Sequence, residues 1–358
     1  MEASIPPYIL YLLGAILIFV LLSVVDKGFK HRKKRRLQQK MCHHAPTIFI
    51  TMYAYKDNYA AACTIHHMTQ AALCPNRLVF GIVQSVTCNS KDVYALYEEA
   101  SAYDTTTTKN VRVKTFRDNY PTTLEAYDVA LTQLYHGENF VLVTSPGTIF
   151  ANHFDTELVQ HHDGGKQTVL TSHGKPFKMG HIQPSIQPNI LTYMTATFPE
   201  SVPIDKTTWF PCFEPTKTLP KLVPRAAPNI QKKPLKVLGC STICSFFKGV
   251  PTFTYGEEDD ADGGSFLLSN SLYSNRYRFY CPPLTVAFPR TTRPKHDVPS
   301  TPGTNISAAY YVFAGVEKET HACYGRARLG LLPHFTTKEI LRKYGNDENF
   351  QLAKSRLR

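Results

Sequence analysis

The strongest constraint on the fold is an alternation, between residues 47 and 143, of short apolar runs and longer stretches with helical periodicity. The runs are rich in β-branched and aromatic residues, which is typical of buried strands. Strands that alternate with helices in this way predict a parallel sheet with right-handed crossovers. The expected strands are Thr47–Tyr55, Leu78–Val86, Val111–Phe116 and Phe140–Val143, and the expected helices are Asn58–Ala72, Lys91–Tyr103 and Pro121–Tyr135.

The fourth apolar run ends in a tight turn, Thr144-Ser145-Pro146-Gly147. Ligands of open α/β sheets bind beyond the carboxyl ends of the strands, so chemistry is expected at this turn. The turn from Ser145 to Thr148 contains no carboxylate and no histidine.

The remainder of the body is less regular. Prolines recur from Gly164 to Pro234, which predicts an extended, proline-rich insert with few helices. Beyond the insert we expect a core segment at Leu235–Phe247, a helix at Phe266–Tyr277, a strand at Arg278–Phe288 that Pro282 and Pro283 interrupt, a strand at Ala308–Val316 and a helix at Thr336–Tyr344. These elements place one domain at residues 47–345, followed by a tail at 346–358.

The amino terminus predicts a membrane anchor. Ile5 to Val25 contains no charged residue and is as long as the ~20 residues that a membrane-spanning helix needs. Basic residues follow this segment rather than precede it, and Val24-Val25-Asp26 is a poor cleavage site, so a removable signal peptide is disfavoured. The prediction is an anchor at 1–26 and a basic juxtamembrane linker at 27–46, with the globular domain on the cytoplasmic side.

The charge is concentrated beside this anchor. The net charge is +12, but eight of the 40 lysines and arginines lie between Lys27 and Lys40. The body is therefore only mildly basic, which makes a nucleic-acid partner unlikely and ranks such a binder below the other hypotheses.

Cysteine and histidine residues give no metal pattern. The nine cysteines are scattered and form no CxxC pair, which indicates free thiols in a reducing compartment. The pairs His66-His67 and His161-His162 are possible metal ligands, but neighbours in sequence point apart on a helix, which disfavours one metal held by both members of a pair. Surface histidines are therefore predicted.

Five segments, which span about Thr47 to Gly345, carry a resemblance to a known family. They are IFITMYAYKDNY, CPNRLVFGIVQ, LYHGENFVLVTSPGTIFANHFD, YGEEDDAD followed by FYCPP, and TTKEILRKYG. Taken together, they resemble the protein-hydroxyproline N-acetylglucosaminyltransferases, cytoplasmic enzymes with a GT-A fold. Asp155 matches the aspartate that follows the family's metal strand, and Pro75 and Arg77 match its second-strand entry.

This resemblance implies an α/β, GT-A-like nucleotide-diphospho-sugar transferase fold, with a mixed, mostly parallel sheet and flanking helices. It implies N-acetylglucosaminyl transfer from a UDP-sugar donor to the hydroxyl of a protein acceptor. Glu257 and Glu258 correspond to the catalytic segment, as base or electrostatic stabiliser. The residues that it assigns to nucleotide-sugar binding are Tyr55, Lys56, Asp57, Gln84 and Ser145.

The sequence departs from this family at its metal site. Ser145 and Gly147 stand where the family has Asp-x-His, Pro289 stands where it has a later histidine, and Glu125 replaces an arginine. Serine and glycine do not replace a carboxylate and an imidazole as cation ligands. No metal ligand is assigned, and Mn²⁺ or Mg²⁺ is expected only if relocated ligands, such as Glu257 to Asp262, hold it. Otherwise lysine or arginine must neutralise the diphosphate.

Two functional hypotheses remain open. The first is a glycosyltransferase that works without the usual metal motif. The second is a catalytically inactive protein that keeps the fold as a membrane-anchored binding module, because a fold does not fix a function.

Overall fold

The computed structural model describes residues 42–55, 57–86, 91–102, 110–117, 120–177, 199, 202–214, 221–226, 233–237, 239–251, 265, 268–269, 271–272 and 275–290. The chain divides into two compact units, Met1–Ala45 and Pro46–Arg358. In the first unit, the described residues form one turn, in which the Ala45 amide donates to the Cys42 carbonyl over 3.3 Å.

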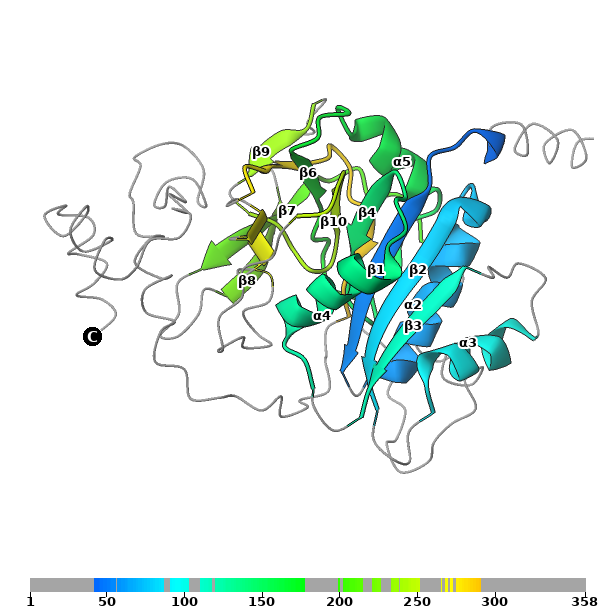
Figure 1. Cartoon of the computed structure of the whole chain (residues 1–358). Helices are drawn as coiled ribbons and strands as arrows, with labels where there is room; N and C mark the ends of the chain where they lie inside the picture. The colour runs from blue at the N-terminus through cyan, green and yellow to red at the C-terminus, as the bar shows by residue number, and fades with distance from the viewer. Residues whose placement is uncertain are drawn as a thin grey trace, which may run out of the picture. The chain divides into compact units, whose positions relative to one another are not determined.

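The second unit is built on a mixed sheet of eight strands in the order β3-β2-β1-β4-β10-β6-β11-β9 (Figure 1). All neighbours run parallel except β10 and β9, which are antiparallel to the strands beside them. The mixed, mostly parallel sheet is therefore confirmed. The strands are β1 (Ile48–Tyr55), β2 (Leu78–Ser85), β3 (Val111–Phe116), β4 (Phe140–Val143), β6 (Thr168–Thr171), β9 (Leu235–Val237), β10 (Ser245–Phe247) and β11 (Arg278–Cys281).

Helices cover both faces of this sheet, because successive strand residues point to opposite sides. Ile48, Ile50 and Met52 of β1 pack in one core, together with α2 (Asn58–Ala71), α3 (Val93–Ser101) and α5 (Phe154–His161). Phe49 packs in the other core with α4 (Thr123–Val129) and the π-helical turn Ala130–Leu134. In Figure 1, α4 lies on the near side of β1 and α2 lies behind the sheet.

Two short ribbons accompany the sheet. β5 (Ile149–Phe150) pairs antiparallel with β12 (Ala287–Phe288), and β7 (Trp209–Glu214) pairs antiparallel with β8 (Lys221–Ala226). The second ribbon lies in the proline-rich insert, whose described part is extended as predicted. The strand expected at Arg278–Phe288 is confirmed as β11 and β12, with the two prolines between them. A short 3₁₀ turn, η1 (Pro75–Arg77), leads into β2.

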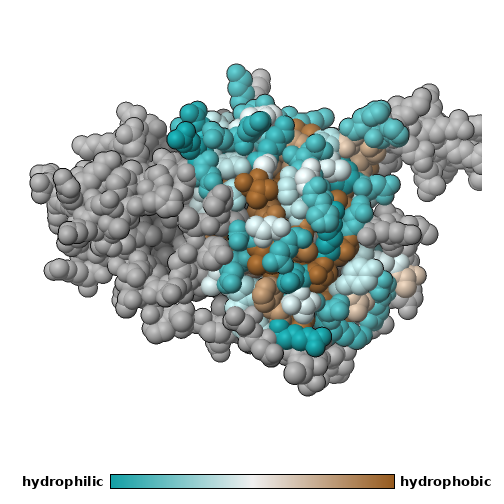
Figure 2. Space-filling view, in the orientation of Figure 1, coloured by the Kyte–Doolittle hydropathy of each residue, from teal (hydrophilic) through white to brown (hydrophobic). Residues whose placement is uncertain are grey.

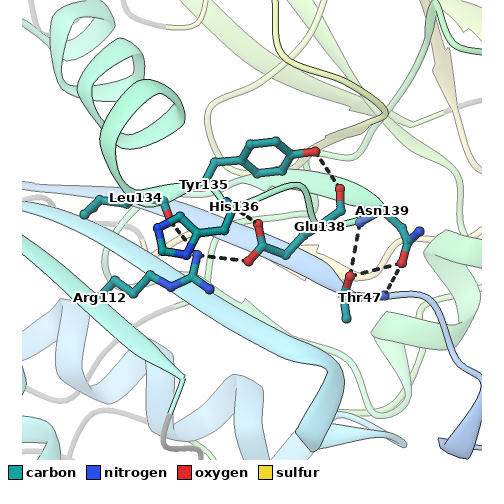
Figure 3. Close-up of polar contacts among 7 residues, drawn as sticks. All are labelled: Thr47, Arg112, Leu134, Tyr135, His136, Glu138 and Asn139. Atoms are coloured by element: carbon teal, nitrogen blue, oxygen red, sulfur yellow. Dashed lines mark hydrogen bonds and ion pairs between the residues drawn. The ribbon is translucent and has the colours of Figure 1, made fainter.

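The amino ends of β1, β3 and β4 are held by a polar network (Figure 3). The Thr47 amide donates to Asn139 Oδ1 over 2.8 Å, which joins the start of β1 to the start of β4. Arg112 of β3 forms an ion pair of 2.9 Å with Glu138, whose side chain is 7% exposed. This network fixes the register of the strands at their amino-terminal ends, whereas the expected site lies at their carboxyl ends.

On the face shown in Figure 2, hydrophilic residues surround the apolar ones. Among the residues that the structure describes, Tyr94 and Val250 are the exposed large hydrophobic side chains.

Membrane attachment concerns residues outside the described part. None of the described helices combines the length and apolar character that crossing a membrane requires. The expected anchor at 5–25, the strand at 308–316, the helix at 336–344 and the tail at 346–358 lie outside the described residues.

The described cysteines are of two kinds. Cys63, Cys240, Cys244 and Cys281 are free and buried, and burial raises the pKa of Cys240 to about 11 and that of Cys244 to about 12. Cys42 and Cys74 are disulfide-bonded. The expectation of free thiols is therefore wrong for these two residues, because spacing in sequence alone does not show which cysteines form disulfide bonds.

Candidate functional site

The order of the strands locates the site. The chain passes from β1 to β2 on one side of β1, and it later returns from β3 to β4 on the other side. The segments that leave β1 and β4 therefore diverge, and open α/β sheets bind ligands at such a switch point. Asp57 follows β1, and the turn 144–148 follows β4. We call Asp57, Ser145, Gly147 and Arg290 the switch-point corner.

The turn after β4 is fastened on both sides. Thr144 Oγ1 donates to the Ile243 carbonyl over 2.8 Å, and Ser145 Oγ donates to the Thr242 carbonyl over 3.0 Å. The Gly147 amide donates to Thr64 Oγ1 of α2 over 2.9 Å. Gly147 has a φ of +79°, which glycine adopts without steric cost. The Ser145 hydroxyl is thus directed at a backbone carbonyl.

Arg290 contributes a cation to this corner. Its terminal nitrogen Nη2 forms an ion pair with the Asp57 carboxylate, and its side chain is 5% exposed. Its Nε is buried and has no hydrogen-bond partner. A Cβ placed on Gly147 would come within 2.7 Å of Arg290 Cδ, so the stem of the arginine lies directly against the turn.

Asp57 occupies the N-cap position of α2, but its side chain makes no capping hydrogen bond. It pairs with Arg290 instead. The first turn of α2 contains no acidic residue, so its positive dipole end is not neutralised from within the helix.

Tyrosines gather at the carboxyl end of β1. The Tyr53 hydroxyl donates to the Pro121 carbonyl over 2.7 Å and lies 3.1 Å from Ser85 Oγ. Burial raises the pKa of Tyr53 well above its ordinary value. The Tyr55 ring contacts Tyr120 edge to face, at 5.4 Å between centroids. Tyr55 is the last residue of β1 and therefore lies at the carboxyl end of this strand, as the sequence predicts.

Gln84 is fully buried, and both ends of its amide are engaged within the protein. Its Nε2 donates to Thr115 Oγ1 over 2.8 Å, and its Oε1 accepts from the Val93 amide over 2.7 Å. The side chain thus joins β2, β3 and the start of α3. A nucleotide-binding role for Gln84 stays a prediction.

Other predicted site residues lie outside the described part of the chain. These are Lys56, Glu257 and Glu258, together with the acidic cluster that ends at Asp262. Within the described ranges, no group of three or more histidine, cysteine, aspartate or glutamate side chains is placed to hold a metal.

The residues of the switch-point corner do not fit a divalent cation. Mg²⁺ and Mn²⁺ favour carboxylate and other oxygen ligands. The turn offers a hydroxyl that donates to a carbonyl, a glycine, and the guanidinium that packs on that glycine. The one carboxylate of the corner, Asp57, is already paired with that guanidinium. A cation here would face another positive charge.

Two other residues from the family comparison have structural roles. Glu125 and Thr122 form a reciprocal capping box at the start of α4. Asp155 is fully buried in α5, where it accepts from the Leu73 and Cys74 amides and pairs with Arg77. These contacts fasten the α2–β2 connection to α5.

Sequence reasoning did not identify Arg290 as a site residue. The usable signal was its position, one residue after Pro289, where the resemblance stated above leads one to expect a histidine. Its approach to Gly147 depends on the β5–β12 pairing, which joins segments far apart in the chain.

The described fold is that of a mixed α/β protein with its candidate site at a strand switch point. No family model and no curated relative matches the chain. Its likeness to solved structures is loose. It has 13% identity to Staphylococcus aureus TarS 1-349 in complex with UDP-GlcNAc, over 74% of this chain and 61% of that one, with a TM-score of 0.39.

A second structure is GalNAc-T7 with UDP, GalNAc and Mn²⁺, at 11% identity over 75% of this chain and 48% of that one, with a TM-score of 0.45. A third is the mannosyltransferase PcManGT from Pyrobaculum calidifontis with GDP-Man and Mn²⁺, at 12% identity over 80% and 70%, with a TM-score of 0.39. The matches cover less than two thirds of TarS and of GalNAc-T7. At these TM-scores the likeness defines no family.

Proposed function

We propose that the switch-point corner binds a UDP-sugar, and that the protein is a glycosyltransferase-like protein that transfers N-acetylglucosamine to a protein hydroxyl. The observation that carries the proposal is the position of the corner. Asp57, a guanidinium and the start of α2 meet where parallel strands diverge, which is the place that α/β proteins use for nucleotides. The five sequence segments that resemble the hydroxyproline N-acetylglucosaminyltransferases supply the identity of the donor and acceptor.

Within this proposal, Tyr55, Lys56 and Asp57 lie along the donor, and Glu257 or Glu258 assists the acceptor hydroxyl as base or electrostatic stabiliser. A second candidate is donor binding without transfer. It is favoured by the turn after β4, which contributes neither carboxylate nor imidazole to stabilise a diphosphate leaving group.

The first prediction concerns UDP binding without metal. Titration calorimetry of UDP in EDTA and in Mn²⁺ is expected to give dissociation constants that agree within about threefold, because the corner holds a guanidinium in place of cation ligands. GDP is the control for the base. Absence of UDP binding under both conditions would contradict the proposal.

The same solutions separate the two candidate functions. If UDP binds, release of N-acetylglucosamine from UDP-GlcNAc in EDTA supports transfer activity. UDP binding with neither hydrolysis nor transfer, in EDTA or in Mn²⁺, supports the binding module. Activity that EDTA abolishes and Mn²⁺ restores would contradict the interpretation of Ser145 and Gly147.

We also propose that residues 5–25 attach the protein to a membrane. The basic run after this segment favours a cytoplasmic body, whereas the disulfide bonds of Cys42 and Cys74 favour an oxidising compartment. The second prediction is that the full chain resists carbonate extraction from membranes and that a chain without residues 1–40 does not. Protease protection of sealed vesicles then shows on which side the body lies. Extraction of the full chain by carbonate would refute the anchor.

A further inference from the structure

We propose that the Arg290 guanidinium binds the diphosphate of the donor, in the place where related enzymes use a divalent cation. This inference rests on the proposed function and adds the means by which the donor's charge is met. It follows from how the fold positions Arg290, from its unused donor, and from the absence of a side chain at Gly147.

The position of Arg290 is fixed by strand pairing. In the β5–β12 ribbon, Phe288 lies opposite Ile149 and Ala287 lies opposite Phe150. Continuing this antiparallel register by two residues brings Arg290 opposite Gly147. A bridge between Phe177 and Arg290, and a 3.0 Å bond from the Phe177 amide to the Pro289 carbonyl, hold the other side of the segment. Arg290 is therefore positioned by backbone contacts on both sides.

One N–H group of the Arg290 guanidinium, at Nε, has no hydrogen-bond acceptor. Arginine carries five N–H groups in a rigid planar fork that matches the oxygens of a phosphate. Nη2 pairs with Asp57, while Nε is buried without an acceptor. Burying a donor without a partner costs free energy, and native proteins rarely leave one so. A phosphate oxygen beside Nε would accept this hydrogen bond and make it charge-assisted.

Gly147 makes room for this arrangement. The related family has histidine at this position, whereas here any side chain would overlap the stem of Arg290, with a Cβ only 3.0 Å from Nε. Glycine at this position therefore removes a possible metal ligand and also leaves space for the Arg290 side chain. A metal ion and the guanidinium would occupy the same place, so we infer that the positive charge of Arg290 replaces that of the metal.

Asp57 acts as a positioning residue. Its carboxylate is 17% exposed and holds one terminal nitrogen of the guanidinium, which leaves the remaining donors oriented. The amino end of α2 begins at the next residue and adds a partial positive charge of about +0.5. The corner therefore presents donors on two sides for an anion that carries two phosphates.

The test uses the full chain, with inorganic pyrophosphate, UDP and uridine as probes in EDTA. Arg290→Gln is expected to weaken the binding of pyrophosphate and UDP by ~10–100-fold, which is the loss of one or two charge-assisted hydrogen bonds. Uridine, which lacks phosphate, is expected to bind both proteins equally. Arg290→Lys keeps the charge but loses the fork, so its loss is expected to be intermediate. This variant also tests the proposal if Arg290→Gln does not fold.

Arg112→Gln is the matched control, because it removes an ion-paired arginine at the amino-terminal end of the strands, away from the switch-point corner. It is expected to leave all three affinities unchanged. Thermal unfolding identifies variants that have lost the fold. If Arg290→Gln lowers the unfolding temperature but binds pyrophosphate as the wild type does, Arg290 is only a structural support and the inference is overturned. An absolute requirement for Mn²⁺ would overturn it as well.

The outcomes distinguish this inference from the proposed function. If pyrophosphate binds through Arg290 but UDP binds no better than GDP, the anion site stands and the UDP-sugar assignment fails. If UDP binds the wild type and Arg290→Gln equally, the proposed function stands and the role of Arg290 fails. If the wild type binds neither pyrophosphate nor UDP, both fail.

Discussion

Replacing Asp155 by alanine is expected to lower the free energy of unfolding by ~3–5 kcal/mol, because it leaves a buried arginine without its counter-charge. The Asp155 carboxylate is fully buried. It accepts from Arg77 Nε over 2.9 Å and from Arg77 Nη2 over 2.8 Å, in addition to the two backbone amides before β2. Urea unfolding followed by circular dichroism measures the change.

Two variants test the cause of this loss. Glu157→Ala, in the same helix, removes a partly exposed carboxylate that lies 3.6 Å from His161 and is expected to cost ~0–1 kcal/mol. In the double variant Asp155→Ala/Arg77→Met, the unpaired charge is gone, so part of the stability should return. A double variant as unstable as the sum of the two single variants would show that the pair does not act as a unit.

Stability is expected to fall by about 3 kcal/mol as the pH decreases from about 6.5 to about 4, through the protonation of His67 alone. Burial, and secondarily the nearby His66, lowers the pKa of His67 to about 4. In this window the unfolded chain binds a proton that the folded chain does not. Stability therefore rises with pH by about 1.4 kcal/mol per pH unit and reaches its full value above about 6.5.

His67→Asn provides the control for this slope. His67 Nδ1 accepts from the Phe150 amide over 3.4 Å, and an asparagine oxygen keeps an acceptor near that place without titrating. The variant is expected to lose about 1.4 kcal/mol per pH unit of the slope between pH 4 and 6.5 relative to the wild type. Parallel slopes for the two proteins would contradict the burial of a neutral imidazole. Acidic groups titrate in both proteins and cancel in the difference.

The first half of the sheet was predictable from sequence. β1 to β4 and the helices between them lie within a few residues of the expected positions, because apolar periodicity is a local signal. The prediction of surface histidines was wrong for His66, His67 and His162, which are buried. The apolar stripe of α2 at Ile65 and Met68 is closely covered by the rest of the protein, so His66 and His67 beside it are buried as well.

The second half of the sheet was only partly predictable. The strand expected at Arg278–Phe288 was found as β11 and β12, but the other short strands gave no clear signal. β9 and β10 are three residues each, and β5 and β12 are two each, which is too short for periodicity to appear. Their pairings join distant segments, such as Phe246 with Leu142, and follow from the packing of the whole sheet.

In the candidate site, too, residue positions could be predicted from local patterns, whereas contacts between distant segments could not. The positions of Asp57 and Tyr55 at the end of β1 could be predicted because they end a recognisable strand, whereas their role in binding a nucleotide sugar stays a prediction. The engagement of Gln84 and Ser145 in internal hydrogen bonds depends on partners remote in sequence, Thr115 and Thr242 among them. Arg290 reaches Asp57 across 233 residues of chain, and no local pattern records that approach.

This long separation has a consequence for biogenesis. Protein chains emerge from the ribosome with the amino terminus first, and contacts between distant segments close late. β1 to β4 are synthesised well before β12, so a nascent chain can form the first strands of the sheet before Arg290 has been synthesised. Ribosome-bound intermediates that end before residue 287 therefore hold Asp57 without its counter-ion, and under the role proposed for Arg290 they are not expected to bind an anion.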